Sequence, residues 1–166
     1  MFISNKRGVV TMKLRTILLS LMVIVLVACN KTPSEHVFEG TIEDMDVKSV
    51  LTVDGDKIQK EHLTYELPYD AASISNQDEA EEAAGIQERA YNSLIEDTPE
   101  GAVEVKVTAD EEKQVIIMNY DLDYSTSENI EALTEQGFLE DSEESEFVSF
   151  KKTKEQYEAD GLKEQE

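Results

Sequence analysis

The residue best placed to do chemistry is Cys29, the only cysteine among 166 residues. It follows the small residue Ala28, which itself follows an apolar run over residues 17–27 that only Ser20 interrupts. A lone thiol is modified by another molecule, reactive in its own right, or without a chemical role. The position of Cys29 at the end of an apolar run favours the first of these, and we predict that the thiol is lipidated.

The segment before Cys29 has the build of a secretory signal. Lys13 and Arg15 precede the apolar run, whose eleven residues fit the roughly 7–15 of a signal peptide and fall short of the about 20 that a membrane-spanning helix needs. We therefore predict that residues 1–28 are removed and do not span the membrane. Met12 is a valid alternative start, because the cations and the apolar run follow it directly.

Leu26, Val27, Ala28 and Cys29 resemble the lipobox of bacterial lipoproteins. The resemblance implies that the Cys29 thiol receives a diacylglyceryl group through a thioether bond, and that a peptidase then cleaves between Ala28 and Cys29. Each buried methylene contributes roughly 0.8 kcal/mol, so two acyl chains hold a protein durably on a bilayer. The implied location is the extracytoplasmic face of the cell membrane, with the membrane as a partner through the lipid on Cys29.

The chain after Cys29 is strongly acidic. All 37 acidic residues lie there, whereas four of the 15 lysines and arginines precede Cys29, so 11 cations face 37 acids and the net charge is −26. A phosphate backbone is bound through clustered lysine and arginine, so this balance argues against nucleic acid and anionic headgroups as partners. The acidic surface either attracts cations and cationic partners or serves as a solvated coat.

The chain divides into three parts. Residues 1–28 are the signal, residues 29–35 are the lipidated cysteine and a short tether, and residues 36–166 are a single domain of ordinary size. The tether is polar and contains Pro33, so the domain is expected to sit close to the bilayer. No internal repeat divides the domain further.

Alternating apolar residues and turn signals predict the strands of this domain. The sequence Asp54-Gly55-Asp56 predicts a hairpin turn, because Gly55 accepts a positive φ without steric cost. Gly40 indicates either a bulge or a close backbone approach within the first strand. Strands are expected over residues 36–42, 49–53, 57–67, 103–108, 114–122 and 147–150.

Three helices complete the prediction. Asn76 is expected to cap the N-terminus of the first helix and Ser127 that of the second, with Gly137 following the second as its C′ residue. Tyr157 is expected to contact the core from the third helix. The helices are expected over residues 76–95, 127–136 and 153–160.

This order, βββαββαβα, predicts an α+β fold: a single domain with a mainly antiparallel sheet and helices packed on one face. A parallel crossover is possible only around the helix at residues 76–95. The strand over residues 114–122 is the most apolar of the domain. It is therefore expected at the centre of the sheet, buried on both faces over residues 115–118.

The sequence predicts neither a metal site nor a catalytic set. His36 and His62 lie on neighbouring expected strands and could pair, but no third ligand completes a transition-metal site. The acidic segments at residues 54–56, 121–123 and 140–146 offer oxygens to calcium, yet none has the pattern of an EF-hand loop. The sequence motifs of serine hydrolases, phosphate-binding loops and dinucleotide-binding loops are absent as well, so no cofactor is predicted.

Several short motifs accompany the lipobox and the alanine-rich helix at residues 76–95. They are Phe38-x-Gly40, Gly55-Asp56-Lys57-Ile58, Asn119-Tyr120-Asp121 and the closing VSFKKTKEQYEADGLKE. Together these motifs resemble the YehR-like family of small bacterial lipoproteins. The resemblance covers nearly the whole chain and implies an α+β fold and an envelope location. The family has no known function, so the resemblance implies no catalytic residues. The acidic segment at residues 140–146 departs from the family pattern.

We expect a membrane-anchored lipoprotein whose domain binds a ligand or a protein partner without catalysing a reaction. One alternative is a transporter-associated solute receptor, although two-lobed receptors of this kind need about twice the length of one ordinary domain. The other is a cell-wall hydrolase, which needs a convergent acid–base or Cys–His set in a cleft. A pocket lined by Tyr65, Tyr120 or Tyr124 would indicate a ligand, whereas a convex surface would indicate a protein partner or a spacer.

Overall fold

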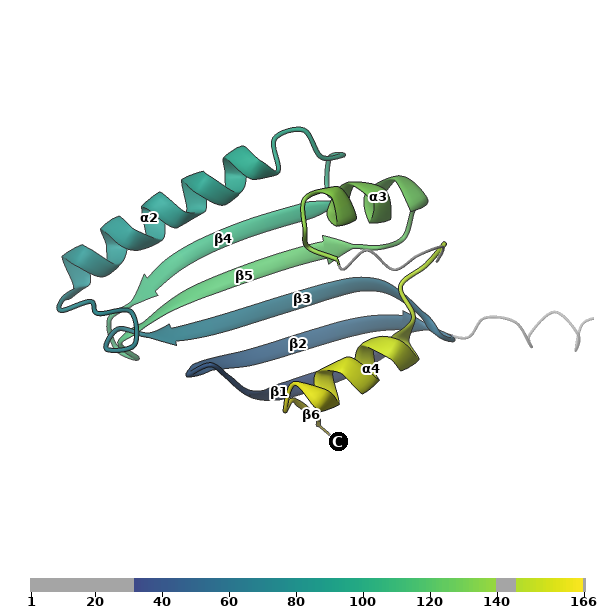
Figure 1. Cartoon of the computed structure of the whole chain (residues 1–166), viewed down its shortest axis with the longest axis horizontal. Coiled ribbons are helices and arrows are strands. Elements are labelled where there is room, and N and C mark those ends of the chain that lie inside the picture. The colour runs from purple at the N-terminus through teal and green to yellow at the C-terminus, as the bar shows by residue number, and fades with distance from the viewer. Residues whose placement is uncertain (1–31, 140–145, 166) are drawn as a thin grey trace, which may run out of the picture. The chain divides into compact units, whose positions relative to one another are not determined.

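A computed structural model describes residues 32–139 and 146–165. Pro33–Glu166 forms one compact unit, and the buried residues of its core lie between Phe38 and Leu162. The unit is organised around a six-stranded sheet with the order β4-β5-β3-β2-β1-β6 and antiparallel pairing throughout (Figure 1). The strands are β1 Ser34–Ile42, β2 Met45–Asp54, β3 Lys57–Pro68, β4 Val103–Asp110, β5 Val115–Asp123 and β6 Lys163–Glu164.

The described helices are α2 Gln77–Leu94, α3 Ser127–Glu135 and α4 Phe150–Ala159. Helix α2 connects β3 to β4, and both strands pair with β5 in the antiparallel sense. They therefore run in the same direction, and α2 forms the crossover at the one place where the sequence allowed a parallel connection. None of the helices in the described ranges is long and apolar enough to cross a bilayer.

Successive residues of each strand point to opposite faces of the sheet, and the two faces differ. On β2, Val47, Ser49 and Leu51 are buried, while Lys48 is exposed and Val50 is half-buried. We call the face of Val47, Ser49 and Leu51 the helical face, and the other the open face. The period-2 pattern thus sorts apolar residues onto one side of the sheet.

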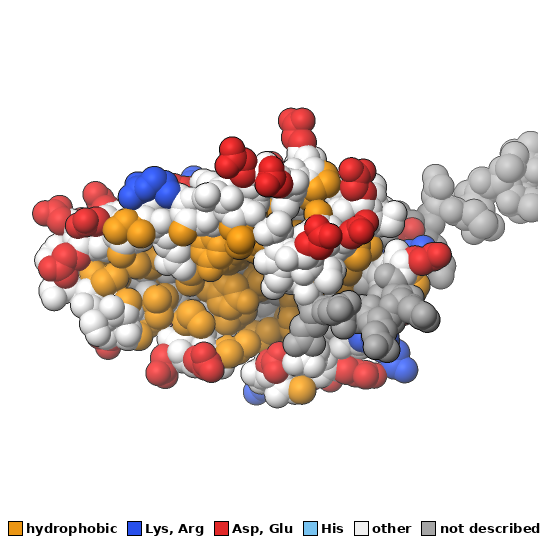
Figure 2. Space-filling view, turned by 45° about the horizontal axis from the view of Figure 1, so that its top comes forward, with side chains coloured by type: hydrophobic (Ala, Val, Ile, Leu, Met, Phe, Trp, Pro, Cys, Tyr) orange, Lys and Arg blue, Asp and Glu red, His pale blue; other side chains and the backbone are white. Residues whose placement is uncertain are grey.

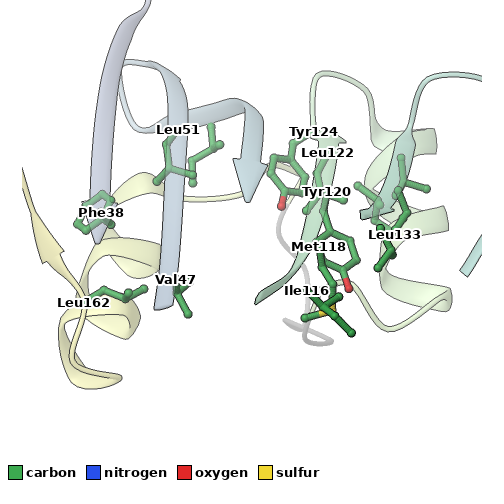
Figure 3. Packing of buried hydrophobic residues seen from close by; sticks show 14 of the residues in the cluster. Phe38, Val47, Leu51, Ile116, Met118, Tyr120, Leu122, Tyr124, Leu133 and Leu162 are labelled. Carbon is green, nitrogen blue, oxygen red and sulfur yellow. The ribbon is translucent and has the colours of Figure 1, made fainter. Parts of the chain in front are cut away.

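All three described helices pack on the helical face. Helix α2 places the Tyr91 ring perpendicular to that of Tyr120 of β5, at 5.4 Å between ring centroids. Helix α4 places Tyr157 at 5.4 Å from Phe38 of β1, and α3 adds the fully buried Leu133 to the same core. Figure 3 shows Phe38, Tyr120 and Leu133 among the buried side chains, with a column of such side chains along β5. The predicted α+β fold, with an antiparallel sheet and helices on one face, is confirmed.

Strand β5 lies between β4 and β3, with a partner on each side as expected. Ile116 and Met118 are buried on the helical face, and Val115 is buried on the open face. Ile117, which also faces the open side, is only half-buried. Burial on both faces is therefore confined to the start of the strand, because no layer covers the open face beyond it among the described residues.

Two glycines explain how neighbouring segments meet. A Cβ built on Gly40 would lie 2.9 Å from the carbonyl oxygen of Gly161 and 3.1 Å from the Cα of Leu162. Of the two roles predicted for Gly40, the structure shows the close backbone approach, which lets the end of the chain pack against β1. Gly55 has a φ of 68° in the β2–β3 turn, as the hairpin prediction requires.

The helix caps follow local chemistry. The side chain of Asn76 accepts a hydrogen bond from the Glu79 N–H at 3.0 Å, which confirms the predicted cap of α2. The cap of α3 is Thr126 instead of Ser127, because Thr126 has an extended backbone and its hydroxyl accepts from the Asn129 N–H at 3.1 Å. One residue separates the prediction from the structure at this cap.

The structure corrects the prediction at the C-terminal end. The strand expected over residues 147–150 is reduced to a single bridge between Ser149 and Lys57, and α4 begins at Phe150, before the expected residue 153. Ser149 caps α4 by accepting a hydrogen bond from the Lys152 N–H, so the chain turns into a helix within the segment where a strand was expected. Strand β6, which was not predicted, then pairs with β1.

Candidate functional site

The helices leave part of the helical face uncovered. On β5, and on β2 from Val47 onward, the apolar residues of this face are buried. On β3, which lies between these strands, Leu63, Tyr65 and Leu67 are only half-buried. Helix α2 packs beside β4 and α4 packs over β1. The middle of the sheet is therefore the floor of a groove, which Figure 2 shows as a hollow of hydrophobic side chains with acidic side chains around it.

One end of the groove, which we call the apolar end, has a volume of about 570 Å³. The Tyr120 ring lies at its base, with its centroid 5.9 Å from Tyr65, 5.4 Å from Tyr91 and 6.1 Å from Phe138. Burial raises the pKa of Tyr120 far above its ordinary value, and a hydrogen bond with Tyr91 adds to the rise. The aliphatic residues and methionines that line this end are Met45, Leu63, Leu67, Leu94, Met118 and Leu122.

The other end, which we call the acidic end, has a volume of about 700 Å³. It lies between α3, which contributes Ile130 and Thr134, and α4, which contributes Gln156 and Tyr157. Both ends are lined by Leu63, Tyr65, Leu122 and Phe138. Because they share these four side chains, the two ends adjoin along β3.

A buried carboxylate lies at the acidic end. Glu61 of β3 is 6% exposed and accepts hydrogen bonds from three hydroxyl groups. Ser49 donates to Oε1 at 2.7 Å, Tyr157 donates to the same oxygen, and Tyr124 donates to Oε2 at 2.8 Å. None of the ion pairs found in the described residues includes Glu61.

The charge of Glu61 affects its tyrosine partners. Burial raises the pKa of Tyr124 well above its ordinary value, and the nearby negative charge of Glu61 raises it further. The pKa of Tyr157 is raised for the same two reasons, in the same order. Both hydroxyls therefore remain protonated and able to donate to Glu61 at neutral pH.

The two histidines do not form a metal pair. His36 lies on the helical face of β1, with Nδ1 2.6 Å from Glu164, and His62 lies on the open face of β3, with Nδ1 2.7 Å from Asp121. Their faces are opposite, because His36 is in register with Leu51 and Leu51 is in register with Glu61, the neighbour of His62. The pairing that the sequence left open does not occur.

His62 also approaches a hydroxyl group, in an arrangement that resembles a hydrolytic set. The Thr64 Oγ1 lies 3.4 Å from the ring nitrogen Nε2 of His62, whose Nδ1 contacts Asp121. However, Thr64 donates its hydrogen to the Asn119 side chain at 2.9 Å. Its backbone neighbours on β3 are paired on both sides, so no pair of free N–H groups lies beside it to stabilise an oxyanion.

The acidic turns have structural roles. Asp56 accepts from the Lys151 N–H and from the Ser149 hydroxyl, both at 2.9 Å, and these bonds lower its pKa. Asp123 accepts from the Ser125 N–H at 2.8 Å. Residues 140–145, which make up most of the third acidic segment, lie outside the described residues. Asp56 and Asp123 are thus engaged in holding a helix start and a turn.

The structure brings together the three tyrosines that the sequence proposed as pocket residues. Tyr65 lines both ends of the groove, Tyr120 lines the apolar end, and Tyr124 lines the acidic end. Cys29, the predicted lipidation site, lies outside the described residues. Sequence reasoning missed Glu61, although its spacing from Leu63 and Tyr65 places a carboxylate in the apolar phase of the strand, which was a usable signal.

The fold and the groove define a small α+β domain in which an antiparallel sheet with helices on one face leaves an apolar floor open. The chain belongs to a family described as a protein of unknown function, DUF1307, whose model matches residues 35–163. It is also similar to the E. coli YehR protein, whose NMR structure matches this chain with a TM-score of 0.61 at 16% sequence identity. The match covers 81% of this chain and 92% of the YehR chain. That likeness shows the fold alone. Among curated proteins, no sequence matches the chain.

Proposed function

We propose that the protein is a lipid-anchored envelope protein that binds a small apolar or amphipathic molecule in the groove, without catalysing a reaction. The observation that carries the proposal is the half-buried apolar surface of β3 at Leu63, Tyr65 and Leu67, in the middle of a largely buried face. A soluble domain gains stability by covering such surface, so its exposure in a concave site indicates a ligand.

The shape of the site favours a small molecule over a protein partner. The two ends of the groove, of about 570 Å³ and 700 Å³, lie within the roughly 300–1,000 Å³ of small-molecule sites. The floor is concave and flanked by helices, which restricts access for a second folded surface. The aromatic lining by Tyr65, Tyr91 and Tyr120 is typical of sites that bind apolar molecules.

The predicted anchor would keep this groove near the membrane. Cys29 and Ser34, where β1 begins, are five residues apart, and five extended residues reach at most about 18 Å. A diacylated Cys29 would therefore hold the start of the sheet close to the bilayer surface. Apolar molecules concentrate in and near bilayers, so this location suits the proposed ligand.

The groove is tested with a neutral fluorescent probe, 1-N-phenylnaphthylamine. The protein used is the mature chain from residue 29 with Cys29→Ser, which removes the lipid; the sheet and its core lie within Pro33–Glu166. Leu94→Glu changes a lining residue that is 47% exposed, so the fold tolerates the change. We expect the probe to bind the parent chain and to bind Leu94→Glu at least about tenfold more weakly, since burial of a leucine contributes about 1.5–3 kcal/mol.

Ile86→Glu is the matched control. Ile86 lies on the same helix, is 54% exposed, and does not line either end of the groove. Its substitution adds the same charge at a similar exposure and should leave probe binding unchanged. Equal weakening by Leu94→Glu and Ile86→Glu, or a parent chain that binds no probe, would contradict the proposed groove.

The anchor is tested separately by Cys29→Ala in the full chain. We expect the parent protein in the membrane fraction with the mass of a diacylglyceryl group at its N-terminus. The variant should remain an unprocessed precursor or leave the membrane. A Cys29→Ala product of mature size that stays in the membrane would contradict lipidation without bearing on the groove.

A further inference from the structure

Glu61 occupies a position that the strand pattern reserves for apolar side chains. Its cross-strand neighbours on the helical face are Leu51 of β2 and Leu122 of β5, and the next residues of β3 on this face are Leu63 and Tyr65. A carboxylate out of water is unfavourable unless an opposite charge or hydrogen bonds compensate it. An aliphatic side chain here would fill the same space without that cost. Packing alone therefore does not explain a carboxylate at this position.

The three hydroxyl donors compensate only part of this cost. A carboxylate has about four acceptor positions, and Oε1 receives two hydrogens while Oε2 receives one. The donors Ser49, Tyr124 and Tyr157 are all neutral, so they satisfy hydrogen bonds and leave the negative charge unbalanced. Among the described residues, Tyr124 is the one hydrogen-bond donor to Oε2.

The lining of the acidic end suits a positive charge. Its aromatic residues are Tyr65, Tyr124, Phe138, Phe147 and Tyr157, and aromatic faces attract organic cations. The other charged residues that line it are two acids, Asp56 and Asp160, and the exposed Lys152. The acidic surface of the whole chain adds an attraction for cations at longer range.

We propose that the ligand of the groove is an amphiphile with a positively charged head, an amine or quaternary ammonium, and that Glu61 binds this head while the apolar end holds the tail. The inference rests on the proposed function, because it names the class of molecule that the groove binds. The two ends adjoin along β3, so one molecule with a charged head and an apolar chain reaches both. Charge complementarity selects the head, and the apolar floor selects the tail.

Three probes with the same decyl chain test the head. Decyltrimethylammonium is cationic, decyldimethylphosphine oxide is neutral and decyl sulfate is anionic, and each is titrated below its micelle concentration to displace 1-N-phenylnaphthylamine from the Cys29→Ser mature chain. We expect the cationic probe to bind at least about tenfold more tightly than the neutral probe, and the anionic probe to bind most weakly. The preference should persist in 0.5 M salt, where exposed charges are screened beyond about 4 Å.

Glu61→Gln then assigns the preference to one residue. The variant keeps the shape of the side chain and removes its charge, so the ratio of the cationic to the neutral dissociation constant should approach one. Glu104→Gln, which removes one charge from an exposed position on the open face of β4, should keep the preference of the parent. Thermal unfolding of both variants shows whether each is folded at the assay temperature.

The outcomes separate the two proposals. Equal binding of the cationic and neutral probes by the parent chain, or a preference that disappears in 0.5 M salt, overturns the role of Glu61 and leaves the groove intact. A preference that Glu61→Gln retains overturns it as well. Failure of all three decyl probes to displace bound dye overturns this inference and leaves the groove intact, whereas a parent chain that binds neither the dye nor any decyl probe overturns the proposed function together with it. If Glu61→Gln does not fold, the salt experiment on the parent chain still tests whether a buried charge produces the preference for the cationic probe.

Discussion

On the open face of the sheet, carboxylates lie beside cationic side chains in water, whereas on the helical face one carboxylate lies among hydroxyl groups out of water. Lys48 and Glu39 are 2.8 Å apart on the open side, with side chains 52% and 43% exposed. Glu61 on the helical side is 6% exposed and has no cationic partner among the described ion pairs. Both faces come from the same strands, so the difference is produced by the helices.

This difference determines which substitutions should change the free energy of unfolding. Water screens the ion pairs of the open face, so each contributes little to stability. The helical face is screened poorly, and a change in packing, hydrogen bonding or charge there acts at nearly full strength.

Substitutions of packed apolar side chains should give the largest difference in stability between the two faces, because their effect depends on how deeply the side chain is buried. Leu51 is fully buried on the helical face of β2, and its neighbour Val50 is half-buried on the open face. We expect Leu51→Ala to lower the free energy of unfolding by about 2–5 kcal/mol and Val50→Ala by less than about 1 kcal/mol. Urea denaturation measures both. Similar losses in the two variants would mean that the open face is covered in solution.

Alkaline pH should destabilise the helical face next. The pKa values of Tyr124 and Tyr157 are raised in the folded protein by burial and by Glu61, while unfolded tyrosines titrate near about 10. Above that pH the unfolded chain loses protons that the folded chain keeps, so stability falls as the pH rises. Each tyrosine that stays protonated contributes a loss of up to about 1.4 kcal/mol per pH unit.

Unfolding free energies measured between pH 8 and pH 11, together with tyrosinate absorbance, follow this loss. Stability should be nearly constant up to about pH 9 and then decrease. A chain whose tyrosines all titrate near the ordinary value while it is still folded would contradict the buried cluster around Glu61. On the open face, Glu66 raises the pKa of Lys113, but this ion pair is largely exposed to water and adds little to the decline.

Loss of one hydroxyl should have a smaller effect that still differs between the faces. Tyr124→Phe removes the donor to Oε2 of Glu61 and leaves a buried carboxylate oxygen without a partner, at a cost of about 1–3 kcal/mol. Thr64→Val removes the donor to Asn119 on the open face, where water replaces it, so we expect a change below about 0.5 kcal/mol. Chemical denaturation at pH 7 compares the two, and an equal change in both would show that water reaches Glu61.

Much of the fold could be predicted because its signals are local. The alternation on β2 to β5, the cap at Asn76 and the positive φ at Gly55 each depend on a few neighbouring residues. The start of α4 could not be predicted in this way. Ser149 and the first turn of α4 are held by Asp56, 93 residues earlier in the chain, and no short window of sequence contains both.

The groove was predictable only in part. Tyr65 and Tyr120 lie on predicted strands and Tyr124 follows one closely, and all three line the groove. That β3 would remain uncovered depends on where α2 and α4 pack, which the sequence pattern does not specify. Glu61 was passed over because, in a chain with 37 acidic residues, one more carboxylate is conspicuous only once its burial is known.

The smallest expected effect is the loss of an ion pair on the open face. Asp121 lies 2.7 Å from His62, and their side chains are 62% and 46% exposed. Water solvates both groups in the folded and the unfolded protein, so Asp121→Asn should change the free energy of unfolding by less than about 0.5 kcal/mol at pH 7. Urea denaturation in 50 mM and in 500 mM salt measures it, and the difference between variant and parent should shrink further in high salt. A loss above about 1 kcal/mol that persists in high salt would show that the open face is shielded from water, and the contrast between the faces would then not hold.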